Sequence, residues 1–274
     1  MSDVEPGSGQ PRPSDGKAPE PSPAAPDAAS PAQNIKEESP SPISAFAGVV
    51  VSPSSTFASM RQSKWHFAIW PLAVLALLAG LATYLFMTRV DMEAFMRNQF
   101  KHSRFAAQMS AEQMDQAVEQ AKNANPWTRV AINVPGTAIF MLLVALVYWV
   151  TFLAMGSAMT YGQTLVVTSW AQVPQMINSA LASVVFMVRN PSELDPMNAV
   201  MSNPGALIGQ ESLAPWLYSL LSSMDLFAVW TIVLYVLGFA AVGKISKGQA
   251  ASVVLAIFVL KTALKLAWAF FMQT

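Results

Sequence analysis

The chain has 274 residues, of which 53% are apolar and 12% charged, and its sixteen basic and sixteen acidic residues cancel. Such a composition is more apolar than that of ordinary soluble domains, and the balanced net charge indicates no nucleic-acid partner. Cysteine is absent, which excludes disulfides, thiolate metal sites and a cysteine nucleophile.

Residues 1–42 are dominated by Pro, Ala, Ser and Gly, and they carry seven acids against three bases. A segment this poor in large apolar residues cannot bury enough surface to offset the entropy cost of ordering. We predict a disordered acidic tail over residues 1–42 and a membrane domain over residues 43–274. In the juxtamembrane stretch that follows the tail, Ser52-Pro53 predicts the start of a short helix.

Five apolar runs then follow, each of roughly the length that a helix needs to cross a hydrocarbon core, about 20 residues. Because lipid offers the backbone no hydrogen-bond partners, each run is expected to be helical. The sequence therefore predicts an all-α polytopic integral membrane protein with amphipathic interfacial helices. The expected spans are 67–87, 130–155, 165–188, 225–243 and 250–272.

The connection 88–129 is predicted to be a helical insert outside the membrane. A first helix over 91–109 would place Arg97, Lys101 and Arg104 together on one face, a pattern that suits binding to an anionic membrane surface. Ser110 with Gln113 predicts a capping box for a second helix. The alternative is that the two helices simply pack on each other and on the spans.

Two lysines, Lys261 and Lys265, lie four residues apart and therefore share one face of the fifth span. A charge inside the membrane is expensive, so they should face protein or water. From the helical rise per residue, Asp225 and Lys265 lie at similar depths on neighbouring spans, which predicts an ion pair between them.

The third span is unusually polar, with Gln172, Gln175 and Asn178 recurring along one side. Pro174 could interrupt this helix, as happens at transporter binding sites, and the stripe would then line a hydrated path. The alternative is interhelical hydrogen bonding, a common use of polar residues in membranes. Two short connectors, 156–163 and 243–249, are similar in sequence and mark either repeated hairpins or a chance likeness.

The chain offers little for catalysis. Its two histidines, His66 and His102, are expected at opposite membrane faces, and no nucleophile, phosphate-loop or metal-ligand motif occurs. We therefore expect no enzyme, no catalytic residue, no cofactor and no metal. The distribution of basic residues does not determine the orientation in the membrane. Four near-membrane bases lie on the same side as the N-terminus, and seven lie on the opposite side.

The arrangement resembles the Yip1-domain family, in particular its bacterial branch, over residues 43–272. The motifs that carry the resemblance are Gly48-Val-Val-Val-Ser-Pro-Ser-Ser-Thr-Phe57, Asp91-Met-Glu-Ala94, Ser110-Ala-Glu-Gln-Met114, Gly162 with Ser169-Trp170 and Pro174, Asp225-Leu-Phe-Ala-Val-Trp230, and Gly238 with Gly243-Lys-Ile-Ser-Lys-Gly-Gln-Ala250. The Asp-Leu-Tyr-Gly-Pro motif of eukaryotic members is missing, which separates this chain from their small-GTPase partnership.

The resemblance implies five spans, a cytoplasmic N-terminus and a C-terminus across the membrane, in the bacterial cytoplasmic membrane. Eukaryotic members act in vesicle trafficking and membrane shaping without known catalysis. The first hypothesis is therefore a non-catalytic protein that organises membrane lipids, membrane-protein partners or copies of itself. The alternative is a transporter of a small solute or lipid, or its membrane subunit. A transporter should have a cavity reaching Gln172, Gln175 or Lys261, and an organiser should have these positions sealed.

Overall fold

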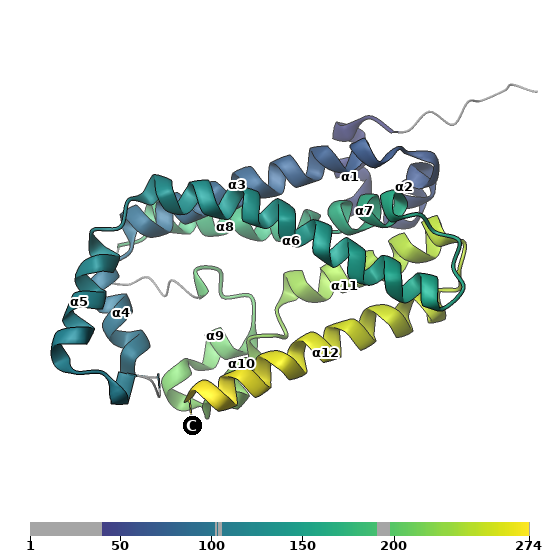
Figure 1. Ribbon diagram of the computed structural model, residues 1–274. Coiled ribbons are helices and arrows are strands. Elements are labelled where there is room, and N and C mark those ends of the chain that lie inside the picture. The colour runs from purple at the N-terminus through teal and green to yellow at the C-terminus, as the bar shows by residue number, and fades with distance from the viewer. Residues whose placement is uncertain (1–39, 102, 104–105, 191–197, 274) are drawn as a thin grey trace, which may run out of the picture. The chain divides into compact units, whose positions relative to one another are not determined.

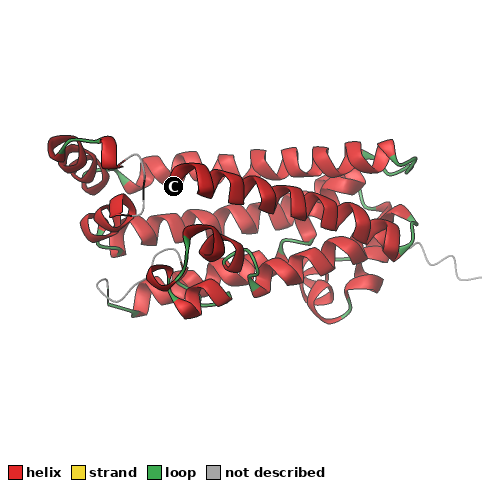
Figure 2. Cartoon of the chain, turned by 90° about the horizontal axis from the view of Figure 1, so that it is seen from below, coloured by secondary structure: helices red, strands yellow, loops and turns green. Residues whose placement is uncertain are grey.

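The structure is a computed structural model that describes residues 40–101, 103, 106–190 and 198–273. Residues 1–39 of the predicted tail lie outside these residues, and Pro42, the last residue of that tail, already begins the first helix, one residue before the expected boundary. Every regular element of the described residues is a helix (Figure 2). An all-helical chain follows from the solvent, since only helices satisfy all their backbone hydrogen bonds within one span.

Five stretches of the chain are long and apolar enough to cross a membrane. Three are single helices, α6, α11 and α12, and one is the helix α3 preceded by the 3₁₀ turn η2. The remaining span consists of two helices, α7 and α8. Their bounds are η2 Trp65–Ala68, α3 Ile69–Arg89, α6 Pro126–Ala154, α7 Tyr161–Trp170, α8 Val173–Val188, α11 Leu226–Gly243 and α12 Lys247–Gln273.

The predicted break at Pro174 is confirmed. α7 ends at Trp170 and α8 starts at Val173, with Gln172 as its N-terminal cap. Pro174 has no N–H to donate to the carbonyl of Trp170, so a continuous helix would leave that carbonyl unpaired inside the membrane. The third span is therefore a discontinuous helix.

Shorter helices occupy the two ends of the spans. Three of them precede the first span, where the expected helix start at Pro53 is confirmed, although the Ser52 side chain makes no capping hydrogen bond. The others lie in the connections between spans. Their bounds are α1 Pro42–Val51, α2 Pro53–Ser59, η1 Met60–Gln62, α4 Met92–Lys101, η3 Ala106–Gln108, α5 Ala111–Lys122, α9 Pro204–Ile208, η6 Gln210–Ser212 and α10 Pro215–Leu221.

The spans alternate in direction and so define two faces (Figure 1). At one face lie α1, α2 and the connectors 155–160 and 244–246, and we name it the connector face. At the other lie α4, α5, α9 and α10, and we name it the insert face.

The two connectors use the same device. After α6 the backbone turns through Gly156 at φ +82°, and after α11 it turns through Lys244 at φ +52°. The next helix then starts in each case with a hydroxyl and a glutamine that cap each other's backbone N–H, Thr160 with Gln163 and Ser246 with Gln249. The similarity of the two connectors in sequence is therefore matched by a similarity in structure.

The core of the described residues centres on Trp170, which is fully buried at the end of α7. Its ring packs on Phe67 and Phe46, with centroids 5.0 and 4.8 Å away, and its Nε1 donates to the carbonyl of Phe67 at 3.3 Å. The indole thus joins the juxtamembrane segment to the spans and has its one polar group satisfied.

In the insert, the expected packing of one helix on the other is what the structure shows. Glu93 of α4 accepts from Arg97 and from Lys122 of α5, both at 3.1 Å, and Arg97 also reaches Asp115 at 3.2 Å. The hydrogen bond from Lys122, followed by that from Arg97, holds the pKa of Glu93 below its ordinary value. Glu93 in turn raises the pKa values of Arg97 and Lys122.

The expected single helix over 91–109 is wrong. α4 ends at Lys101, because the chain must reverse before Ser110 to bring α5 antiparallel beside α4. The capping box of Ser110 and Gln113 is confirmed. Since Arg97 is engaged by α5, only the exposed Lys101 remains of the predicted surface-binding cluster within the described residues. Arg104 lies outside them, and membrane-surface binding by this cluster stays a prediction.

Candidate membrane cavity

A cavity of about 940 Å³ lies between α6 and α8 on one side and α10, α11 and α12 on the other. Its lining includes all six polar residues of the spans that the sequence singles out. These are Gln172, Gln175, Asn178, Asp225, Lys261 and Lys265. Polar groups in a membrane turn away from lipid, so spans that carry them pack with these faces toward one another.

The amide groups of the third span fall into two kinds. Gln172, at the break between α7 and α8, is 7% exposed, and its Nε2 donates to the hydroxyl of Tyr235 at 2.5 Å. This bond is interhelical, as the structural alternative for this span predicted. Gln175 and Asn178 lie further along α8, half-buried on the cavity wall, and hydrogen-bond to no other described residue.

The predicted ion pair between Asp225 and Lys265 is wrong, although both residues line the cavity. Asp225 is the N-terminal cap of α11: its Oδ1 accepts from the backbone N–H groups of Phe227 and Ala228 at 2.9 and 3.0 Å. Its other oxygen accepts from the hydroxyl of Ser202. The helical rise predicts similar depths for the two residues. It does not predict that the carboxylate would bind the free backbone N–H groups at the start of α11 instead of the lysine.

Lys265 finds its partners on α10 instead. Its Nζ donates to the Ser219 carbonyl at 3.3 Å and to the Ser223 hydroxyl at 3.0 Å. These oxygens lie at the C-terminal end of α10, where carbonyls lack helical partners and a cation is favoured. Lys261, one turn earlier on α12, is exposed, and no carboxylate of the described residues pairs with either lysine.

The described part of the connection between α8 and α11, which includes the short helices α9 and α10, lines one end of the cavity. Asn203 caps α9 through the N–H of Ala206 and also donates to Asn198, whose amide donates to the Tyr218 hydroxyl. The backbone of Leu226 donates to Ser202 at 3.0 Å. This network holds the connection against the start of α11.

Two hydroxyls on the cavity wall are buried without a hydrogen-bond partner among the described residues, those of Ser222 and Thr262. Such groups are costly in a dry interior and point to water or a ligand. Sequence reasoning missed both, and it also missed Tyr235. The only available signal was that each is a hydrogen-bonding side chain in or beside an apolar span.

The described residues contain no cluster of three or more His, Asp or Glu side chains that could hold a metal ion. The fold and the cavity together define a class: a multi-pass helical membrane protein with a polar cavity among its spans. Comparison with known proteins gives the family. Residues 47–269 match the Yip1 domain, so the chain belongs to the Yip1 domain family.

A relative in Bacillus subtilis (strain 168), the membrane protein YknW, is 25% identical over 201 residues. The alignment covers 73% of this chain and 79% of the relative. No solved structure matches the chain. The family assignment confirms the resemblance derived from the sequence motifs.

Proposed function

We propose that the chain is a non-catalytic membrane protein that organises membrane-protein partners by binding an acidic group of a partner in the cavity. The observation that carries this proposal is the pair of lysines on α12, which open into the cavity without a carboxylate partner from the described residues. The cavity lining holds two lysines and one aspartate, a net charge of +1. An uncompensated cation in lipid is unfavourable, so an anionic occupant would stabilise the protein.

The cavity offers more than charge to such an occupant. Gln175 and Asn178 provide amides on the opposite wall, and Ser222 and Thr262 provide buried hydroxyls; none of these four groups bonds to another side chain or backbone group that the structure describes. A carboxylate accepts several hydrogen bonds at once, so it complements this set of donors. The expectation that an organiser would seal these positions is not met, and the open cavity would instead be the partner's binding site.

The test is photo-crosslinking in living cells from two positions on α12. Phe258 lines the cavity, whereas Leu264 is 64% exposed and lies outside the cavity lining. A benzophenone amino acid at 258 should give a defined protein adduct that is lost when Lys261 and Lys265 are changed to Gln. The same residue at 264 should not give this adduct. Adducts at 258 that do not depend on the lysines would contradict the proposal.

A transporter, or its membrane subunit, is the second candidate, because the cavity reaches Gln172, Gln175 and Lys261 as a transporter requires. Single cysteines at these positions can be labelled with a membrane-impermeant maleimide, since the chain has no native cysteine. Alternating access predicts that each position reacts from both sides of the membrane. Labelling from one side alone would reject transport through this cavity.

We further propose that the connector face lies in the cytoplasm of a bacterial cell, with the N-terminus on that side of the cytoplasmic membrane. Arg61, Lys64, Lys244 and Lys247 lie near the membrane at this face, without an acidic ion-pair partner among the described residues. Short connectors rich in unopposed bases remain on the cytoplasmic side during insertion. Reporter fusions after residue 158 and at the C-terminus should report opposite sides.

A further inference from the structure

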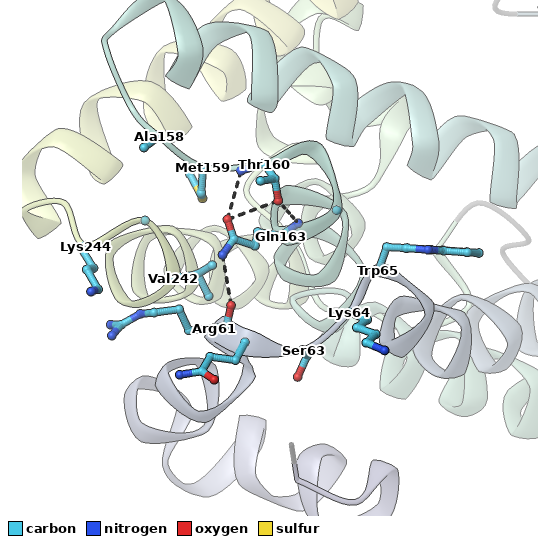
Figure 3. A pocket seen from close by; sticks show the side chains of 13 residues that line it. Arg61, Ser63, Lys64, Trp65, Ala158, Met159, Thr160, Gln163, Val242 and Lys244 are labelled. Atoms are coloured by element: carbon cyan, nitrogen blue, oxygen red, sulfur yellow. Dashed lines mark hydrogen bonds between the residues drawn. The ribbon is translucent and has the colours of Figure 1, made fainter. Parts of the chain in front are cut away.

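A second pocket, of about 810 Å³, lies at the connector face, away from the membrane cavity (Figure 3). Three segments that are distant in sequence form it: residues 61–65 before the first span, residues 158–163 at the start of α7, and residues 242–244 at the end of α11. None of its lining residues is shared with the membrane cavity. It is therefore a separate candidate site.

Three cationic side chains line this pocket, those of Arg61, Lys64 and Lys244. In Figure 3, Arg61 and Lys244 stand at one end of the pocket, and Lys64 and Trp65 at the other. The acidic residues that the structure describes all lie in or beside the helices of the insert face. They are Asp91, Glu93, Glu112, Asp115, Glu119, Glu211 and Asp225. The pocket is thus positive, and nothing in the described residues neutralises it.

The pocket is built around fixed groups. Nε and Nη2 of Arg61 donate to the carbonyl of Ala241 at 3.1 and 2.5 Å, which holds the guanidinium at the end of α11. The Gln163 side chain, itself part of the cap of α7, donates to the carbonyl of Arg61 at 3.1 Å. These bonds tie the three segments together and leave the remaining N–H groups of the guanidinium for an anion.

Lys244 adds an independent observation. It is the only non-glycine residue at positive φ among the described residues, with φ +52°, and the equivalent turn after α6 uses glycine, Gly156. A left-handed backbone is unfavourable for a lysine and favourable for glycine. Lys244 ends α11 in this conformation, as the residue after a helix commonly does, and its position places a cation on the rim of the basic pocket.

The position of the pocket indicates a lipid as the source of the anion. Trp65 lines it and is 60% exposed, and Trp70, five residues further, is 55% exposed. Exposed tryptophans at the end of a span mark the headgroup level of the bilayer. A phosphate bound between the cations would therefore lie at the depth of the lipid phosphates, with its acyl chains free to follow the exposed surface of the spans.

We propose that this pocket binds the phosphate headgroup of an anionic phospholipid from the leaflet at the connector face. Arg61 would contribute the planar donor that suits phosphate, and the two lysines would contribute charge. The site does not depend on the cavity function proposed above.

The test uses the full-length protein in detergent and measures lipid adducts by native mass spectrometry. Phosphatidylglycerol should bind at least ten-fold more tightly than phosphatidylcholine, and Lys64→Gln with Lys244→Gly should remove this preference. Lys244→Gly keeps a residue suited to the left-handed turn, so lost binding will not reflect a lost fold. Arg89→Gln with Arg129→Gln removes the same charge from exposed residues at the insert face and should leave the preference unchanged.

Three outcomes would overturn the proposal. Equal loss in the insert-face control would mean that binding follows net charge alone. Competition by inorganic phosphate at the same concentration as the lipid would assign the pocket to a soluble anion. Phosphatidylglycerol binding that emerges only after the acids of residues 1–39 are changed to amides would assign the pocket to the chain's own N-terminal segment.

Discussion

Gly238 is the position where the packing of α11 is most open to a simple test. A Cβ at this residue would lie 2.7 Å from Cγ1 of Val167 and 3.2 Å from two ring carbons of Phe57. Both neighbours are fully buried, so neither can withdraw without disturbing its own packing. Gly238 therefore lets α11 approach both α7 and the juxtamembrane helix α2.

The Gly238→Ala variant should be destabilised by overpacking, which costs about 1–3 kcal/mol. Alanine also improves helix propensity by about 1 kcal/mol, and this gain partly hides the clash. Gly136 of α6 provides the control, because a Cβ there has no neighbour within 4 Å. Since both variants gain the same propensity, the difference between them isolates the packing cost and should be about 1–3 kcal/mol.

The measurement is thermal unfolding of both variants in one detergent, followed by tryptophan fluorescence, to which the buried Trp170 should contribute. Gly136→Ala should unfold at or above the wild-type temperature, and Gly238→Ala below it. A Gly238→Ala variant as stable as Gly136→Ala would refute the close approach of α11 to Val167 and Phe57.

Two further predictions concern charged side chains. The pKa of Glu93 is lowered in the folded protein, so its ion pairs should stabilise the α4–α5 hairpin fully when the pH is above the ordinary pKa of a glutamate. This stabilisation should be lost as the pH falls through the lowered pKa of the folded protein. Hydrogen exchange in α5 should therefore differ between wild type and Glu93→Gln at neutral pH and converge in acid; a difference that persists in acid would contradict the assignment. At the start of α11, Asp225→Ala should cost about 1 kcal/mol of stability in detergent. Asp225→Asn should cost little, because asparagine also caps helices. Equal losses of stability in the thermal melts of the two variants would contradict the capping role and favour a role for the charge.

The sequence predicted best what depends on neighbours in the chain. The five spans, the break at Pro174 and the capping box at Ser110 all follow from local rules, and the structure has each of them. The six polar residues of the candidate site could also be predicted to converge, because lipid penalises them all alike. Their convergence on one cavity follows from that common penalty.

What could not be predicted is which partner each group would choose. Asp225 and Lys265 both line the cavity, yet the carboxylate caps α11 and the ammonium binds the C-terminal end of α10. That choice depends on the path of the connection 198–225, whose short helices and turns have no periodic pattern. The hydrogen bond of Gln172 to Tyr235 also could not be predicted, because the partner of a tyrosine in an apolar span depends on how the spans pack together.

The segment between the two pockets, residues 164–171, helps to decide between an organiser and a transporter, because a transport path would have to pass along it. Gln163 lines the connector pocket and Gln172 lines the membrane cavity. Every residue from Thr164 to Ala171 is buried, and Trp170 anchors this segment against Phe67. To open a path along α7, the protein would have to remove a fully packed tryptophan, which costs about 3–5 kcal/mol when its contacts are lost. The described conformation therefore favours two separate binding sites over one continuous route between the two pockets.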